Sequence, residues 1–221
     1  MTLENASWLK APAFRELARA LGAEQGLVRV VGGAVRDTLL GLESEDIDLA
    51  TPLLPQEVTR RAQKLGAKVV PTGIAHGTVT VVYKDHVYEV TTLRRDVSTD
   101  GRRATVAFSQ DWREDASRRD FTINALYADP LSGEIFDYFG GLADLEARSV
   151  RFIGDAGQRI AEDYLRILRY FRFQARFGSA ISFGADFSYE IATDLRLRAS
   201  VGEGFKAPTL FQLFSDFGNE E

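Results

Sequence analysis

The chain of 221 residues contains no cysteine and only two histidines. Without cysteine, disulfide bonds and thiolate-bound metals are excluded, which suits a reducing compartment, and we expect a cytoplasmic location. His76 and His86 are too few and too far apart in the sequence to predict a metal site. The charged and apolar fractions, 27% and 45%, are typical of a folded globular protein rather than a disordered one.

Long apolar runs are also missing, so the sequence predicts no membrane-spanning helix and no membrane partner. The N-terminal segment lacks the basic-then-apolar pattern of a signal peptide, and residues 5–27 instead predict one amphipathic helix. The net charge of −5 does not by itself indicate a nucleic-acid-binding protein. Residues 148–176 are strongly basic, however, and a local basic face can bind a phosphate backbone.

The order of apolar patterns predicts the element types. Strands are predicted at 28–31, 46–50, 68–70, 78–83 and 87–93, and helices at 34–40, 55–65 and 158–177. Residues 94–113 are polar without a clear period and predict a mobile loop. This order indicates an α+β or α/β fold with one sheet covered by helices, and no obligate protein partner is inferred.

A glycine pair and two aspartates are the most informative feature of the sequence. Gly32 and Gly33 follow an apolar run, where glycine lets the backbone approach a phosphate, and Arg36 stands beside them. Asp46 and Asp48 are two residues apart, so on a strand both point to one face and repel each other unless a cation lies between them. Carboxylate oxygens are the ligands that Mg²⁺ prefers, together with substrate phosphate.

A third carboxylate could come from Glu89 in a neighbouring strand. The alternative is that these acids are ordinary solvated side chains. Arg118 and Arg119 precede a segment that looks buried, so their guanidinium groups could be aimed at a triphosphate or a ribose.

A polar stripe follows one face of the predicted helix 158–177. Asp163 and Arg166 could offer an acceptor and donors to the edge of a base, and Arg169 and Arg172 continue the stripe. The alternative is a salt-bridged amphipathic helix, whose charges pair at spacings of three and four.

Four segments together resemble the tRNA nucleotidyltransferase and bacterial poly(A) polymerase family of the DNA polymerase beta superfamily. They are residues 32–51 with both glycines and both aspartates, residues 118–125, the segment Phe139-Gly140-Gly141-Leu142-Ala143-Asp144-Leu145, and Glu162-Asp163-Tyr164-Leu165-Arg166. The resemblance covers about residues 25–177 and implies an α+β, polymerase-beta-like head with a mixed sheet flanked by helices. It predicts a head at 1–157, one truncated neck helix at 158–178 and an unrelated extension at 179–221.

The resemblance implies template-independent transfer of CMP and AMP from CTP and ATP to the 3′ end of tRNA, by in-line attack at two metal ions. It implies Mg²⁺ at Asp46 and Asp48, and the strand pattern adds Glu89 as a candidate third catalytic carboxylate. The implied nucleotide-binding residues are Gly32, Gly33, Arg36, Arg118, Arg119, Asp163, Arg166, Arg169 and Arg172. Poly(A) addition and a non-catalytic nucleotide-binding remnant are the alternatives, and an outer-membrane transport fragment is a third, weaker one.

After residue 178 the pattern changes to a sustained alternation of apolar and polar residues, which predicts strands. The segment from Phe187 to Asn219 resembles strands of a TonB-dependent outer-membrane receptor. The family continues instead into helical regions that grip tRNA. We therefore expect weak tRNA affinity, because much nucleic-acid affinity comes from backbone phosphate contacts.

Overall fold

The computed structural model describes residues 2–3, 6–44, 46–73, 76–100, 103–178, 186–192 and 195–200. The helices are α1 (Ser7–Lys10), α2 (Pro12–Ala20), α3 (Gly33–Leu39), α4 (Pro55–Lys64), α5 (Trp112–Ser117), α6 (Gly141–Glu146), α7 (Ala156–Glu162) and α8 (Leu165–Phe177), with 3₁₀ turns η1 (Ala23–Gln25) and η3 (Thr122–Asn124). The strands are β1 (Arg29–Val31), β2 (Asp48–Thr51), β3 (Lys68–Gly73), β4 (Thr78–Tyr83), β5 (His86–Thr92), β6 (Arg94–Asp100), β7 (Arg103–Phe108), β8 (Leu126–Ala128), β9 (Ile135–Asp137), β10 (Asp186–Ala192) and β11 (Leu195–Ser200).

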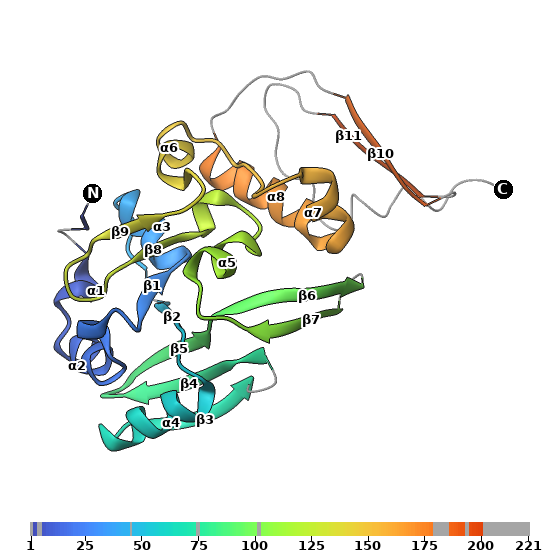
Figure 1. Cartoon of the computed structure of the whole chain (residues 1–221). Helices are drawn as coiled ribbons and strands as arrows, with labels where there is room; N and C mark the ends of the chain where they lie inside the picture. Colours follow the sequence, from blue (N-terminus) through green and yellow to red (C-terminus); the bar gives the residue numbers. More distant parts are fainter. Residues whose placement is uncertain are drawn as a thin grey trace.

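The central feature is a seven-stranded sheet in the order β3-β4-β5-β2-β1-β8-β9 (Figure 1). Strands β2 and β5 run parallel, and the other neighbours in this sheet are antiparallel. A parallel pair needs a long crossover, which α4, β3 and β4 supply between β2 and β5. The mixed sheet flanked by helices confirms the predicted α+β class.

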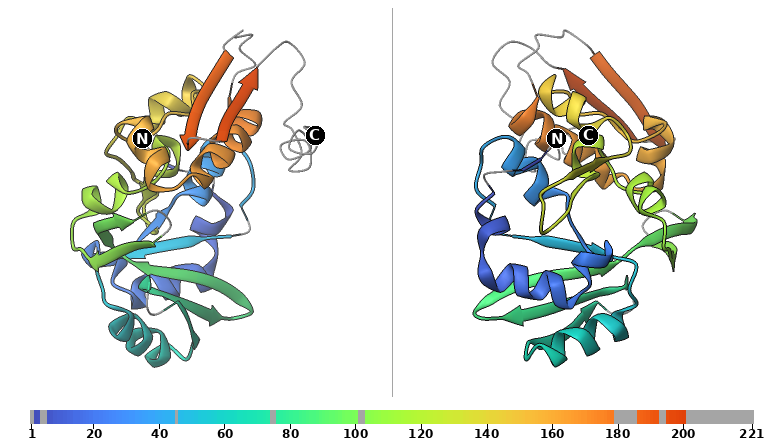
Figure 2. Two further views of the ribbon diagram at one scale, coloured as in Figure 1. Left: turned by 90° about the vertical axis from the view of Figure 1, so that its right-hand side faces the viewer. Right: turned by 60° about the vertical axis from the view of Figure 1, so that its left-hand side comes forward.

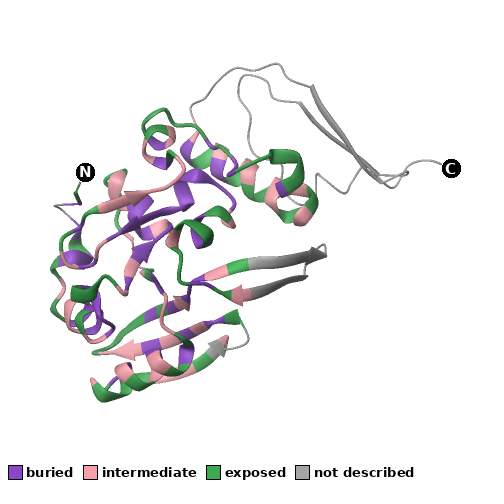
Figure 3. Cartoon of the chain, in the orientation of Figure 1, coloured by how far each residue is buried: buried purple, intermediate pink, exposed green. Residues whose placement is uncertain are grey.

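The two faces of the sheet are covered differently. Leu49 of β2 and Val90 of β5 are register partners, fully buried in the larger core with Val58 of α4 and Leu17 of α2. On the opposite face a smaller cluster includes Ala50 and residues of β1, β8 and α5. Because side chains alternate along a strand, Asp48 belongs to this second face. Figure 2 shows the sheet and its helices from two further sides, and Figure 3 shows buried residues concentrated in the central strands.

Helix α8 docks on the head through aromatic rings. The ring centroids of Phe121 and Phe173 are 5.3 Å apart, and those of Phe121 and Phe152 are 4.8 Å apart. Tyr170 stacks on Phe152 with an interplanar angle of 14°. Such ring pairs stabilise contacts by about 0.5–1.5 kcal/mol each beyond the area they bury. The part of the predicted neck around Tyr170 and Phe173 therefore packs against the folded core of the head.

Two predicted helices are broken in the structure. The predicted helix 5–27 is divided between α1 and α2 because Pro12 starts a new helix and Ala11 before it is extended, at φ −67° and ψ 120°. The predicted helix 158–177 is divided because Asp163 is extended, at φ −156° and ψ 105°. The Asp163 carboxylate accepts the N–H of Leu165 at 3.0 Å and so caps α8.

The prediction of a loop at residues 94–113 was wrong for most of that segment. Strands β6 and β7 form an antiparallel hairpin that starts at Arg94 opposite Phe108, and α5 begins at Trp112 (Figure 1). The segment contains several Val and Thr residues, and β-branched residues favour extended backbone.

Beyond residue 178, β10 and β11 pair antiparallel, in agreement with the predicted strands. Residues 201–219 of the predicted receptor-like segment lie outside the described residues. Within the described part of the chain, no helix is long and apolar enough to cross a membrane.

Candidate nucleotide and metal site

The predicted carboxylates meet on the second face of the sheet. Asp48 and Glu89 are register partners across the parallel pair β2 and β5, so their side chains leave the sheet side by side. Asp46 lies just before β2, and all three residues are exposed to solvent. The structure thus confirms that Glu89 lies on the strand next to Asp48.

The electrostatics of Asp48 fit a cation site. Although the residue is exposed overall, desolvation of its carboxyl group raises its pKa, and the negative charges of Glu89 and Asp46 raise it further. The guanidinium of Arg119 acts in the opposite direction. Among the described residues, no three His, Cys, Asp or Glu side chains are close enough to hold a metal by themselves. The chemistry of the donors still suits Mg²⁺, which usually takes one or two carboxylates together with substrate phosphates.

Gly32 closes one side of this site. Val30 is opposite Leu49, so the next step of the register brings Val31 and Gly32 toward Asp48. Gly32 has a backbone φ of 71°, a conformation that residues other than glycine rarely adopt. A Cβ at this position would lie 3.7 Å from the Arg119 guanidinium. Gly32, Arg119 and Asp48 therefore lie close to one another on the second face of the sheet.

Arg119 is held in this position by buried partners. Its guanidinium donates to the Asp115 carboxylate at 3.1 Å and to the Tyr127 hydroxyl at 3.3 Å. Arg118 donates from Nε to the same carboxylate at 2.9 Å. Burial by itself would raise the pKa of Asp115, but the charges of Arg119 and Arg118 hold it at about 2. An ionised Asp115 therefore orients both predicted arginines.

Arg36 has a different environment from the one its sequence position suggests. The residue is 6% exposed, and its guanidinium donates to Asp37 at 2.8 Å and to the Asn124 side chain at 2.5 Å. The same group lies 4.3 Å from the Phe177 ring centroid, under α8. The contact with Phe177 joins α3 to the neck, and a triphosphate contact by Arg36 stays a prediction.

The arginines of α8 are mostly paired within the protein. Arg166 donates to Glu162 at 2.6 Å, and Arg169 donates to Asp120 at 2.7 Å. Arg172 is exposed and lies 5.4 Å from the Phe173 ring centroid. The Arg166 pair, at a spacing of four, favours the alternative of a salt-bridged helix, whereas Arg169 pairs with the head and not within the helix. The Asp163 carboxylate already accepts the hydrogen bond that caps α8. Recognition of the nucleotide base by Asp163 and Arg166 stays a prediction.

Some residues that organise the site were not singled out from the sequence: Asp115, Asp120, Asn124 and Tyr127. Asp115 precedes Arg118 and Arg119 by three and four residues, which is the spacing of facing side chains on a helix. That spacing could have indicated the pair, had a helix been predicted there.

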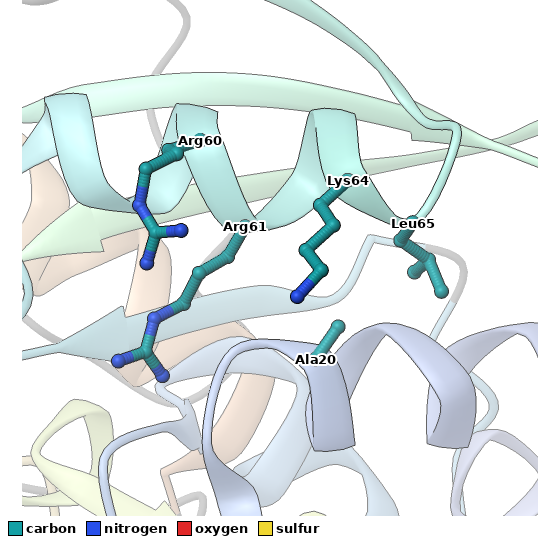
Figure 4. Close-up of a pocket in the computed structure, with 5 residues that line it drawn as sticks. All are labelled: Ala20, Arg60, Arg61, Lys64 and Leu65. Carbon is teal, nitrogen blue, oxygen red and sulfur yellow. The ribbon is translucent and has the colours of Figure 1, made fainter.

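A separate depression of about 430 Å³ lies between α2 and α4 (Figure 4). It is lined by Ala20, Arg60, Arg61, Lys64 and Leu65. Helices α2 and α4 contribute to the larger core, on the face of Leu49, whereas Asp48 points to the other face. The depression is therefore on the opposite side of the sheet from the carboxylates.

A model of the poly A polymerase head domain matches residues 28–151. The chain belongs to this family. The matched part of this family member contains Gly32, Asp46, Asp48, Glu89 and Arg119, which are the residues gathered on the second face.

The individual relatives of the chain are named CCA tRNA nucleotidyltransferase, CCA-adding enzyme or tRNA nucleotidyltransferase. The chain is 48% identical over 164 residues to mouse (Mus musculus) mitochondrial CCA tRNA nucleotidyltransferase 1, a match that covers 74% of this chain and 38% of the relative. The crystal structure of Bacillus stearothermophilus CCA-adding enzyme in complex with CTP is 40% identical, with a TM-score of 0.63, over 74% of this chain and 39% of the other. A tRNA nucleotidyltransferase complexed with a primer tRNA and an incoming ATP analog is 32% identical, with a TM-score of 0.59, over 73% and 46%.

The chain thus spans less than half the length of each of these relatives. The resemblance of residues 187–219 to a TonB-dependent receptor is not supported by these comparisons, and the family model ends at residue 151.

Proposed function

We propose that this chain is the nucleotide-binding head of an enzyme that adds CMP and AMP to the 3′ end of tRNA. The observation that carries the proposal is the pairing of Asp48 with Glu89 across β2 and β5, beside Gly32 and Arg119. Relatives named for this activity, and related structures with CTP, with tRNA and with an ATP analog, support it. Because the chain spans only part of their length, the activity of the chain itself is part of the proposal.

In the proposed reaction the tRNA 3′ oxygen attacks the α-phosphorus of the nucleotide. The new oxygen–phosphorus bond replaces the bond to the β-phosphate, and pyrophosphate leaves. Arg119, fixed by Asp115 and Tyr127, would pair with the triphosphate, and Gly32 would let the backbone approach it. Asp46 and Asp48, with Glu89 beside them, would hold Mg²⁺. Bound metal supplies charge neutralisation and activates the attacking hydroxyl group.

The prediction that 1–157 is the head, 158–178 the neck helix and 179–221 an unrelated extension stays part of this proposal, as do a cytoplasmic location and the absence of an obligate protein partner. The aromatic contacts of Tyr170 and Phe173 with Phe121 support a neck that folds onto the head. The extension has no role in the proposed reaction.

The test is incorporation of labelled CMP and AMP into tRNA lacking its 3′ CCA, with and without Mg²⁺. We expect Mg²⁺-dependent incorporation that Asp48→Ala abolishes, while Asp85→Ala, in the turn between β4 and β5, leaves it unchanged. Addition of AMP alone in long tails would identify poly(A) synthesis instead. Nucleotide binding without incorporation would identify a non-catalytic remnant of the fold.

A further inference from the structure

Asp115 is a buried acid whose hydrogen bonds reach several separate parts of the chain. The residue is 1% exposed. Its carboxylate accepts from the side chains of Arg118, Arg119 and Tyr127 and from the backbone N–H of Arg94, at 2.9, 3.1, 2.8 and 3.1 Å. A buried carboxylate needs such partners, because an unpaired buried charge strongly destabilises a fold. Each partner is thereby fixed in position by the same group.

Arg119 is the partner that faces the proposed site. Strand β8 lies next to β1, with Tyr127 opposite Val31, and β1 lies next to β2. Arg119 spans from the Tyr127 hydroxyl to the backbone of Gly32, and its charge acts on Asp48. A long arginine side chain left unfixed would lose rotamer freedom each time it bound a ligand.

Arg94 is the partner that belongs to the β6–β7 hairpin. Its N–H bond to Asp115 is at the first residue of the hairpin. At the other end, Ser109 donates from its backbone to the Leu93 carbonyl at 2.8 Å and from its hydroxyl to Glu114 at 2.5 Å. Both ends of the hairpin are therefore attached to α5 (Figure 1).

We propose that Asp115 is a positioning residue that holds Arg119 against the Gly32 and Asp48 side of the sheet and ties that placement to the base of the β6–β7 hairpin. That Arg119 receives a triphosphate rests on the proposed function. That Asp115 fixes Arg119 and Arg94 together does not depend on it. A purely structural acid would affect stability alone, whereas a positioning acid also sets the dynamics and ligand affinity of Arg119.

The test compares Asp115→Asn with Asp129→Asn in the full chain. Asp129 is the matched control, because its carboxylate also accepts several hydrogen bonds, from Leu131 and Ser132, but it lies in the turn after β8. Two quantities are measured: the affinity for inorganic tripolyphosphate by calorimetry, and the water-exchange rates of the Arg119 Nε–H and Arg94 amide protons by NMR.

We expect Asp115→Asn to weaken tripolyphosphate binding about tenfold, because Arg119 without its carboxylate partner must lose rotamer freedom when it binds, and to speed both exchange rates. Asp129→Asn should leave affinity and rates within about twofold. Exchange rates and affinity equal to the wild type in a folded Asp115→Asn chain would overturn the proposal.

If Asp115→Asn does not fold, Tyr127→Phe takes its place, because it removes the hydroxyl group between Arg119 and Asp115. Faster exchange of the Arg119 Nε–H is then the expected result, and an unchanged rate would contradict the proposal. A wild-type chain that does not bind tripolyphosphate would count against the proposed function, while the exchange rates would still decide the role of Asp115.

Discussion

Replacing Asp120 with alanine should destabilise the fold and weaken the contact between the head and the neck helix α8. One carboxylate oxygen accepts from the Asn124 amide at 3.0 Å and from the Phe121 N–H at 2.9 Å, and the other pairs with Arg169 of α8. The residue is 8% exposed, so its loss leaves two buried donors without an acceptor. Each such donor costs about 1–3 kcal/mol, so the expected total is about 2–6 kcal/mol, and the partly exposed Arg169 that is left behind adds little.

The assay is equilibrium unfolding in urea, monitored by circular dichroism. The Arg169 side chain is 43% exposed, so Arg169→Ala should cost only about 1 kcal/mol. The exposed neighbour Arg172 serves as the control, and Arg172→Ala should change the unfolding free energy by less than about 0.5 kcal/mol. A loss below about 1 kcal/mol in Asp120→Ala would refute the reasoning, as would an equal loss in Arg172→Ala.

Three further results are expected. Asp48→Asn should raise the melting temperature at pH 7. Because the pKa of Asp48 is raised in the folded chain, its ionised carboxylate destabilises the fold at a pH above that pKa, and this effect is lost at a pH below it. Gly141→Ala should cost about 1–3 kcal/mol in urea unfolding, because a Cβ there would overlap the Thr122 carbonyl oxygen. As pH falls from about 5 to about 1, the chain should lose about 2–3 kcal/mol of stability from Asp115, whose pKa of about 2 is below that of an unfolded aspartate, and Asp115→Asn should remove this dependence.

The controls follow from the same structure. Gly157→Ala is the matched change for Gly141→Ala, because a Cβ at Gly157 would meet only the Asp155 side chain. Equal stability of the two variants would contradict the steric argument. An unchanged or lower melting temperature for Asp48→Asn would contradict the electrostatic one, and a pH dependence of unfolding that survives Asp115→Asn would assign the acid sensitivity to other groups.

The sheet was the more predictable part of the fold. Alternation of apolar and polar residues predicted β4 and β5 within a residue of their observed ends, and it placed Glu89 on a strand near Asp48. The break at Asp163 was missed because the helical spacing of apolar residues continues across it. An aspartate capping the next helix is a local signal that was present.

The partners of the arginines were not predictable from sequence spacing. Arg36 contacts Asn124 and Phe177, which are far from it along the chain; the fold of the head brings Asn124 close, and the docking of α8 brings Phe177 close. A surface arginine and a buried one have the same sequence signal. Arg119 is different, because its acid partner Asp115 is one helical turn away.

The most direct test of the central claim, that nucleotide binds at the face formed by Gly32, Asp48, Glu89 and Arg119, is an NMR titration of the ¹⁵N-labelled chain with CTP and Mg²⁺. We expect shifts at the Gly32, Gly33 and Asp48 amides and at the Arg119 Nε–H, and loss of those shifts in Asp48→Ala. Shifts confined to the depression between α2 and α4, around Arg60 and Lys64 (Figure 4), would contradict it.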